Sequence, residues 1–514
     1  MRRIAIAAAL LVGAAVPAAL PAQHQHGNAG RDGTRADTAH AHHSPARHDS
    51  AAQKRAEDPE PASRKRGMRL EPPPLPPPAE AGAHEGHGAV RSAEAGAEHA
   101  TAGHAAGGHR MTMAPLGGGW TVMGMAQAYP IATAGLADER SPMRETEPYL
   151  TQPAAMINVE SPGSALVLRT TLNFEGITQP DGELTYGGWG EGFIDRRHPH
   201  TLLHELMVSA NVWSAAGGAL SLSAGKGFAP YGTDDPMARP VAKYPTNHHL
   251  SQILERWTAS LAWLRGPWSV EAAVFGGAEP EGPYDLSNVR SFGDSWSARV
   301  IRRFGGEGTA ARWEASASYG SVAEVHHGEK ERTSLVNGYL RHDARHRFGT
   351  LYALVEASRS EPHGEAEGYY ALLGEAMAGI GRHRAYARVE YATRPEYERE
   401  VASDIRGFFR YDHDAEPIGA TRWLITSLGY GRRLTGYPAA AMPFVEVQHH
   451  RVRGERGQID PNLLYGSDSF WSVTAGVRVF LGSAGQMRMG SYGVLDDMTW
   501  SHRAPDRGMV QTRR

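Results

Sequence analysis

The sequence predicts an all-β protein, a closed antiparallel transmembrane β-barrel of about sixteen strands that follows a disordered N-terminal segment. Three observations support this prediction. From Trp120 onward, short segments that alternate apolar with polar or small residues follow one another along the chain. Tight links alternate with long connections between these segments. After residue 22 no apolar run reaches about 18 residues, which leaves a closed barrel as the available way to cross a membrane.

The chain begins with two arginines, continues with an apolar stretch to Ala19 and reaches Ala22 just before the polar Gln23. This pattern is typical of a secretory signal peptide, so we predict residues 1–22 as the signal, with cleavage after Ala22. Export of a barrel-forming chain predicts the outer membrane as its location, with lipid and the barrel assembly machinery as partners.

Residues 23–115 are rich in His, Pro, Ala and Gly and almost lack aromatic and branched apolar residues. Such a segment cannot bury enough surface to fold, so we predict a disordered periplasmic arm. Imidazole suits Zn and Cu and thioether favours Cu(I), so the arm is a candidate for loose capture of Cu, Ag or Zn, with an unselected polar linker as the alternative. No other cofactor is expected. The candidate ligands are His24, His26, His40, His42, His43, His84, His87, His104, His109, Met111 and Met113.

Residues 116–482 are predicted as the barrel, and residues 483–514 as a C-terminal tail or a final hairpin. Alternation in the segment from Trp268 to Val274 places Trp and Val on one face and Ser269 and Glu271 on the other. Tryptophans at strand ends suit interfacial girdles. The predicted strands are 120–129, 154–161, 165–178, 202–213, 219–227, 256–265, 268–277, 295–304, 311–321, 331–342, 347–359, 368–380, 383–394, 421–433, 440–449 and 471–481.

Long connections are predicted at 130–153, 179–201, 228–255, 278–294, 322–330, 360–367, 395–420 and 450–470, each after an odd strand. The polar face of the strands predicts a wetted lumen, which a dry soluble sandwich or propeller core would not accept. The lumen residues that we single out are Arg169, Glu175, Glu271, Arg299, Arg388 and Glu390.

The densest group of functional side chains precedes and enters the predicted strand 202–213. It is predicted as a cluster at the extracellular rim, formed by Asp195, Arg196, Arg197, His198, His200 and His204. A zinc-protease reading is disfavoured because that motif requires His-Glu-x-x-His on a helix, whereas here His200 and His204 would lie about 13 Å apart along a strand.

The Asp195-x-x-His198-Pro199-His200 core resembles the hallmark of a family of largely uncharacterised bacterial outer-membrane barrel proteins. Ala229–Met237, Asn247–Ser251 and Phe292–Arg299 are also similar to that family, so the resemblance covers the first half of the barrel. Arg197 and Thr201 depart from the Gln and Asp that are usual in the family. The resemblance implies the fold, the compartment and a frequent association with copper or heavy-metal handling.

The third long connection carries both signs of charge. By analogy with general porins, it is predicted to fold into the lumen as a constriction that sets up a transverse field for polar solutes; a proline-stiffened surface loop is the alternative. The candidate constriction residues are Asp234, Asp235, Arg239, Lys243, His248 and His249.

The sequence therefore predicts a porin-like outer-membrane channel for small polar solutes or metal complexes. The alternative is a metal-associated binding protein in which the barrel is mainly an anchor. No nucleophile–base pair or phosphate-binding glycine loop stands out, and with no cysteine and a net charge of -3 neither a thiolate enzyme nor a nucleic-acid binder is expected. A homotrimer is compatible with the sequence.

Overall fold

A computed structural model of the chain describes residues 113–141, 143–179, 184, 186–187, 201–215, 217–233, 235–239, 241, 243–280, 282–305, 311–326, 329–362, 368–397, 417–435, 439–482 and 489–495. All of them belong to one of two compact units of the chain. The predicted signal peptide and nearly all of the predicted arm lie outside the described residues. The overlap is Met113–Pro115, because the first strand begins at Met113, three residues before the predicted start of the barrel.

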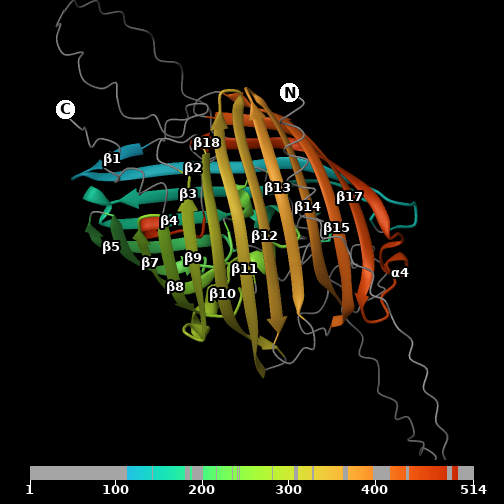
Figure 1. Ribbon diagram of the computed structural model, residues 1–514, viewed down its shortest axis with the longest axis horizontal. Coiled ribbons are helices and arrows are strands. Elements are labelled where there is room, and N and C mark those ends of the chain that lie inside the picture. Colours follow the sequence, from blue (N-terminus) through green and yellow to red (C-terminus); the bar gives the residue numbers. More distant parts are fainter. Residues whose placement is uncertain are drawn as a thin grey trace, which may run out of the picture. The chain divides into compact units, whose positions relative to one another are not determined.

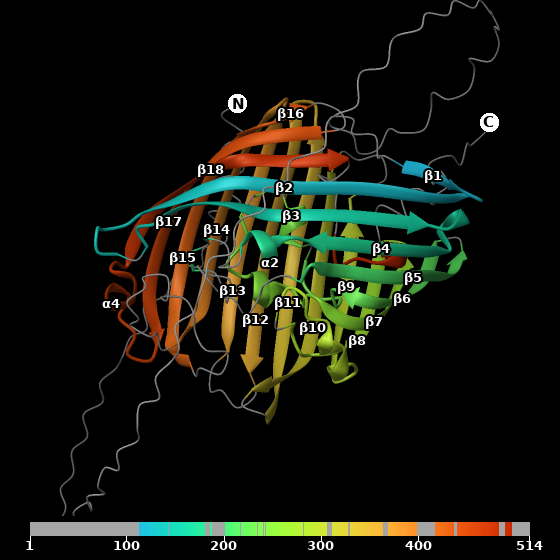
Figure 2. The same cartoon turned by 180° about the vertical axis from the view of Figure 1, so that it is seen from behind.

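In the described part of the chain, sixteen long antiparallel strands form a closed barrel, which confirms the predicted fold (Figure 1). Each strand pairs with the next, and β18 pairs with β2 to close the ring (Figure 2). The strands are β2 (Trp120–Leu136), β3 (Thr146–Glu160), β4 (Leu166–Asn173), β5 (Leu203–Ala215), β6 (Gly218–Gly227), β7 (Arg256–Arg265), β8 (Trp268–Phe275), β9 (Ser295–Phe304), β10 (Ala311–His326), β11 (Glu329–His346), β12 (Gly349–Pro362), β13 (Tyr369–Ile380), β14 (His383–Tyr397), β15 (Pro417–Arg432), β17 (Ala439–Arg456) and β18 (Ser469–Gly482).

Two further short strands extend this sheet without adding to the ring. β1 (Met113–Gly117) folds back as a hairpin on β2. β16 (Leu434–Thr435) follows β15 and pairs with the start of β17. The first strand of the ring starts and the last strand ends on the side of the barrel that carries the short turns, because Gly482 at the end of β18 pairs with Met125 near the start of β2. An even number of strands produces this arrangement.

Alternation along each strand sorts the side chains into two faces. In β8, Ser269, Glu271 and Phe275 are buried on the inner side, whereas Trp268 and Val274 are exposed on the outer side. The last strand shows the same period, with Trp471 and Leu481 outside. A strand has a side-chain period of two, so a one-residue slip of the register would exchange the faces. The outer surface is therefore largely apolar.

Several predicted boundaries are wrong, including the end of the strand predicted at 440–449, since β17 continues to Arg456. The connection at 130–153 is mostly strand, because β2 continues to Leu136 and β3 starts at Thr146. Pro130, Pro148 and Pro153 broke the strand signal in this stretch, although strands tolerate proline at edges and irregularities, and the β2–β3 register does shift near Tyr129. The strand predicted at 165–178 ends at Asn173, after which α2 (Glu175–Thr178) begins.

The connection predicted at 322–330 is likewise mostly strand, since β10 reaches His326 and β11 starts at Glu329. The remaining short helices are η1 (Pro162–Ser164), η2 (Pro236–Ala238), α3 (His248–Ser251), η3 (Ser287–Ser291), α4 (Pro461–Tyr465) and η6 (Gly493–Leu495). Among the residues that the structure describes, none of the helices has the length and apolar character needed to cross a membrane.

The lumen as candidate functional site

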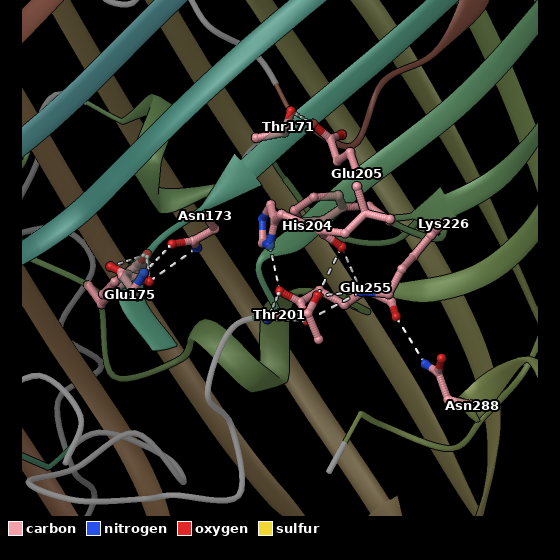
Figure 3. A network of polar contacts seen from close by, with 12 residues as sticks. Thr171, Asn173, Glu175, Thr201, His204, Glu205, Lys226, Glu255 and Asn288 are labelled. Carbon is pink, nitrogen blue, oxygen red and sulfur yellow. Dashed lines mark hydrogen bonds and ion pairs between the residues drawn. The ribbon is translucent and has the colours of Figure 1, made fainter. Parts of the chain in front are cut away.

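A buried polar network joins the ends of three long connections at one edge of the barrel (Figure 3). Its centre is Glu255, which accepts hydrogen bonds from the backbone nitrogen and the hydroxyl of Thr201 at 3.0 and 2.8 Å. His204 Nδ1 lies 2.5 Å from the same carboxylate. Lys226 Nζ lies 3.8 Å from it and also donates to the hydroxyl of Thr201 and to the carbonyl of Leu203.

Asn288 completes the network by donating to the backbone carbonyl of Glu255 at 3.1 Å. Glu255 has a positive φ of 52°, a strained conformation that persists where surrounding contacts fix it. The side chains of His204 and Lys226 are fully buried. The network is therefore suited to anchoring loops.

Of the predicted rim cluster, the structure describes only His204. Asp195, Arg196, Arg197, His198 and His200 lie outside the described residues. Within the described residues, no group of three or more His, Cys, Asp or Glu side chains is arranged to hold a metal ion. The sequence analysis missed the contact of Thr201 and Lys226 with Glu255. A carboxylate just before a strand gives no indication of which distant residues it will contact.

The third long connection, residues 228–255, is called L3 below and lies inside the barrel. Its Arg239 forms an ion pair with Glu356 of β12 at 3.2 Å, and its Asn247 donates to the same carboxylate at 3.0 Å. The backbone nitrogen of Thr246 donates to Glu390 of β14 at 2.6 Å. L3 therefore reaches wall strands that are far from its own roots on β6 and β7.

Wall residues also hold L3 by donating to its backbone carbonyls. Arg388 of β14 donates to Lys243 at 2.8 Å, Arg478 of β18 donates to Arg239 at 3.1 Å, and Arg299 of β9 donates to Gly232 at 3.1 Å. These arginines come from three separated parts of the ring. Together with Glu356 and Glu390 they fix the loop across the lumen.

The structure places most of the predicted constriction residues in this inner position. Asp235, Arg239, Lys243 and His248 are buried and His249 is half-buried, whereas Asp234 lies outside the described residues. Asp235 caps η2 by accepting from the backbone nitrogen of Met237. His248 stacks on Tyr244 with ring centroids 4.8 Å apart.

The six predicted lumen residues are all buried on the inner side. Arg388 pairs with Glu375 at 2.9 Å, and Arg299 pairs with its cross-strand neighbour Glu271, with one contact of 3.0 Å. Glu175 accepts from the hydroxyl of Tyr244 at 3.1 Å. Arg388, Arg299 and Glu271 therefore each have a partner of opposite sign on the inner side.

Residues 489–495, called the C-terminal plug below, also lie against the inner wall. The hydroxyl of Tyr492 accepts from the backbone nitrogen of Phe228 at 2.9 Å and donates to Glu205 of β5 at 2.8 Å. Arg169 donates to the carbonyl of Ser491 at 3.1 Å, and Arg299 donates to that of Gly490 at 3.0 Å. The described part of the predicted tail thus contains no strand and contacts both L3 and the wall.

Burial dominates the electrostatics of the plug. Loss of hydration raises the pKa of the Tyr492 hydroxyl well above its usual range, and the nearby Glu205 carboxylate raises it further. The hydroxyl therefore keeps its proton and can donate to Glu205 while it accepts from L3. Val494 and Leu495 pack beside Ala219, Ala262 and Leu264, so the plug has an apolar attachment as well.

No protein-family model matches the chain, and no curated protein matches it. Solved structures with a similar fold include a loop-deletion mutant of OmpT, an outer membrane protein of Vibrio cholerae, at 9% identity and a TM-score of 0.42, covering 70% of this chain and 99% of that one. An anion-selective porin from Comamonas acidovorans has 12% identity and a TM-score of 0.40, with 70% and 99% covered. The outer membrane channel DcaP of Acinetobacter baumannii has 8% identity and a TM-score of 0.43, with 71% and 98% covered. At these values the similarity does not extend to function.

Proposed function

We propose that the chain is a porin-like outer-membrane channel that passes small polar solutes or metal complexes through a lumen narrowed by L3 and the C-terminal plug. The observation that carries this proposal is the position of L3, which is buried inside the barrel and joined to β9, β12, β14 and β18. A loop fixed across a polar lumen would narrow the path through the barrel and set what can pass.

The outer surface supports the membrane location. Large aliphatic side chains such as Leu166, Val212 and Leu428 are exposed on the outside of the strands. Aromatic residues stand near strand ends, with Trp268 at one edge and Trp296 at the other. An apolar band bounded by aromatic girdles is expected where a barrel meets hydrocarbon and headgroups, whereas in water it would promote aggregation.

The paired charges of the inner wall support polar solutes as the permeant class. Arg239–Glu356, Arg388–Glu375 and Arg299–Glu271 place both signs side by side on the lumen. Charges that are neutralised in pairs give no strong preference for one sign of ion, which suits polar solutes in general. With its buried polar network serving as an anchor, the barrel is proposed to be a passive channel and not an enzyme.

Single-channel recording tests this proposal. The full chain, purified in detergent and inserted into a planar bilayer, is expected to give small steps with weak preference between K⁺ and Cl⁻. Deletion of residues 23–115 is expected to leave the step size unchanged. A correctly inserted barrel that conducts nothing contradicts the channel. If such a silent barrel binds metal, and deletion of residues 23–115 abolishes this binding, the metal-associated binding protein is favoured instead.

A further inference from the structure

Five methionines from four separate segments meet on the inner side of the barrel. This methionine cluster consists of Met123 and Met125 of β2, Met156 of β3, Met237 of L3 and Met489 of the C-terminal plug. All five are at most 5% exposed. Met125 and Met156 are directly opposite each other in the β2–β3 register and both face inward.

The cluster is unusual in its composition. Five of its nine buried members are methionine, whereas the chain has 16 methionines in 514 residues. Leucine or isoleucine would fill a core with better-defined side-chain conformations, and methionine is normally used sparingly. Gap filling is the ordinary role of buried methionine, but that role does not require sulfur to be gathered from four segments.

The thioether is a soft, uncharged donor. It selects soft ions of low charge such as Cu(I), whereas Zn²⁺ prefers imidazole, carboxylate and thiolate. Because the chain has no cysteine, the sulfur donors of the barrel are methionines alone. Within the described residues, the inner wall offers no comparable group of imidazoles and carboxylates for a harder ion.

Two buried carboxylates adjoin the cluster and can balance a single positive charge. Glu175 accepts from the hydroxyl of Tyr244, whose ring belongs to the cluster, at 3.1 Å. Asp235 accepts from the backbone nitrogen of Met237 at 2.7 Å. An isolated buried ion would be costly, so nearby charge of opposite sign is needed for an ion to bind in this position.

We propose that the methionine cluster is a binding site for a soft monovalent metal ion, Cu(I) or Ag(I). The ion would be held by thioethers of the wall, of L3 and of the C-terminal plug, with no change in its oxidation state. Its binding would join the two lumen segments to β2 and β3. The site is separate from the histidine-rich arm and goes beyond the proposed channel activity.

The test compares three full-length proteins, so that any metal held by the arm is the same in each. The cluster variant carries Met125→Leu, Met156→Leu and Met489→Leu, which nearly conserve side-chain volume. The control carries Met143→Leu, Met207→Leu and Met442→Leu at buried positions outside the cluster. Folding is checked by heat-modifiable migration in gels, and bound Ag(I) is counted by elemental analysis after gel filtration.

The cluster variant is expected to retain about one Ag(I) per chain fewer than the wild type and the control. X-ray absorption of the Cu(I)-loaded proteins is expected to show a smaller sulfur shell in that variant alone, with Zn(II) binding equal in all three. Equal Ag(I) retention in the cluster variant and the control would overturn the proposal and leave gap filling as the role of these residues. If the triple variant does not fold, Met489→Leu alone serves, and an unchanged Ag(I) affinity in that protein counts against the site.

Discussion

Replacing Glu356 with alanine tests whether L3 is held in the lumen by its contacts with β12. The Glu356 carboxylate is fully buried and accepts from Arg239 at 3.2 Å and Asn247 at 3.0 Å, both in L3, and from Asn337 of β11 at 3.1 Å. Two hydrogen bonds to a charged group contribute about 1.5–3 kcal/mol each. Breaking one buried ion pair by removing one partner costs about 3–5 kcal/mol. The estimate from hydrogen bonds and the estimate from the ion pair therefore agree.

The energy gives an expected change in loop position. About 1.4 kcal/mol corresponds to a factor of ten in an equilibrium constant, so a loss of about 3–5 kcal/mol raises the displaced population of L3 by about a hundredfold to a few thousandfold. Since Asn337 is on the wall, the cost of its lost partner is common to both loop positions. We therefore expect Glu356→Ala to increase the single-channel conductance and to add flicker between levels.

Planar bilayer recording measures this change, and two companion variants interpret it. Glu356→Gln keeps an acceptor for the amides but loses the charge opposite Arg239, so an intermediate conductance is expected. Glu361→Gln on the same strand is the matched control, because that side chain is 51% exposed and pairs with Arg359 at the surface, where ion pairs contribute at most about 1 kcal/mol. Conductance of folded Glu356→Ala identical to that of Glu361→Gln would refute the role of this carboxylate in positioning L3.

Three further variants probe the plug, the anchor and the wall. Tyr492→Phe removes two hydrogen bonds worth about 1–3 kcal/mol in total, so carboxypeptidase should digest the C-terminus faster. Because the pKa of Tyr492 is raised in the folded protein, the stabilisation by its hydroxyl is complete below about pH 10 and is lost as the pH rises further. The wild type should therefore release the plug at alkaline pH, and the variant should lack this pH dependence. Glu255→Gln weakens the partner of the buried Lys226, so limited proteolysis within residues 228–255 should accelerate, and resistance equal to the wild type would argue against the anchor. A Cβ at Gly429 would lie 2.0 Å from the Tyr386 ring, so Gly429→Ala should destabilise the barrel by about 1–3 kcal/mol in urea, whereas Gly374→Ala, with open space at its Cβ, should be nearly neutral.

The wall could be predicted from the sequence because its signal is local. A period of two places Trp268 outside and Glu271 inside from the order of residues alone, and all sixteen strands are found near their predicted positions. The errors arose where local signals conflict with the sheet. Pro148 and Pro153 suggested a loop, but backbone pairing with β2 on one side keeps much of this stretch extended.

The contacts that hold L3 and the plug could not be predicted, because they join residues far apart in the chain. Arg239 and Glu356 are separated by 117 residues, and Glu205 and Tyr492 by 287. Glu356 was within reach of sequence reasoning, since it occupies an inward position of a predicted strand and is buried like Glu375 and Glu390. The pairing of Glu356 with Arg239 could not be predicted, because the fold of L3 depends on the closed ring around it. The Asp-x-x-His-Pro-His segment lies outside the described residues, so its role stays a prediction.

The chemistry of the inner wall favours a channel over a passive anchor. Replacing buried ion pairs with apolar residues of similar size is often neutral or stabilising, so a barrel that served only as an anchor would gain from an apolar interior. This barrel instead keeps Arg239–Glu356, Arg388–Glu375 and Arg299–Glu271 on its inner side. The polar groups of these pairs, together with backbone carbonyls of L3, fix L3 against the wall. A loop fixed in this way is what the proposed channel requires.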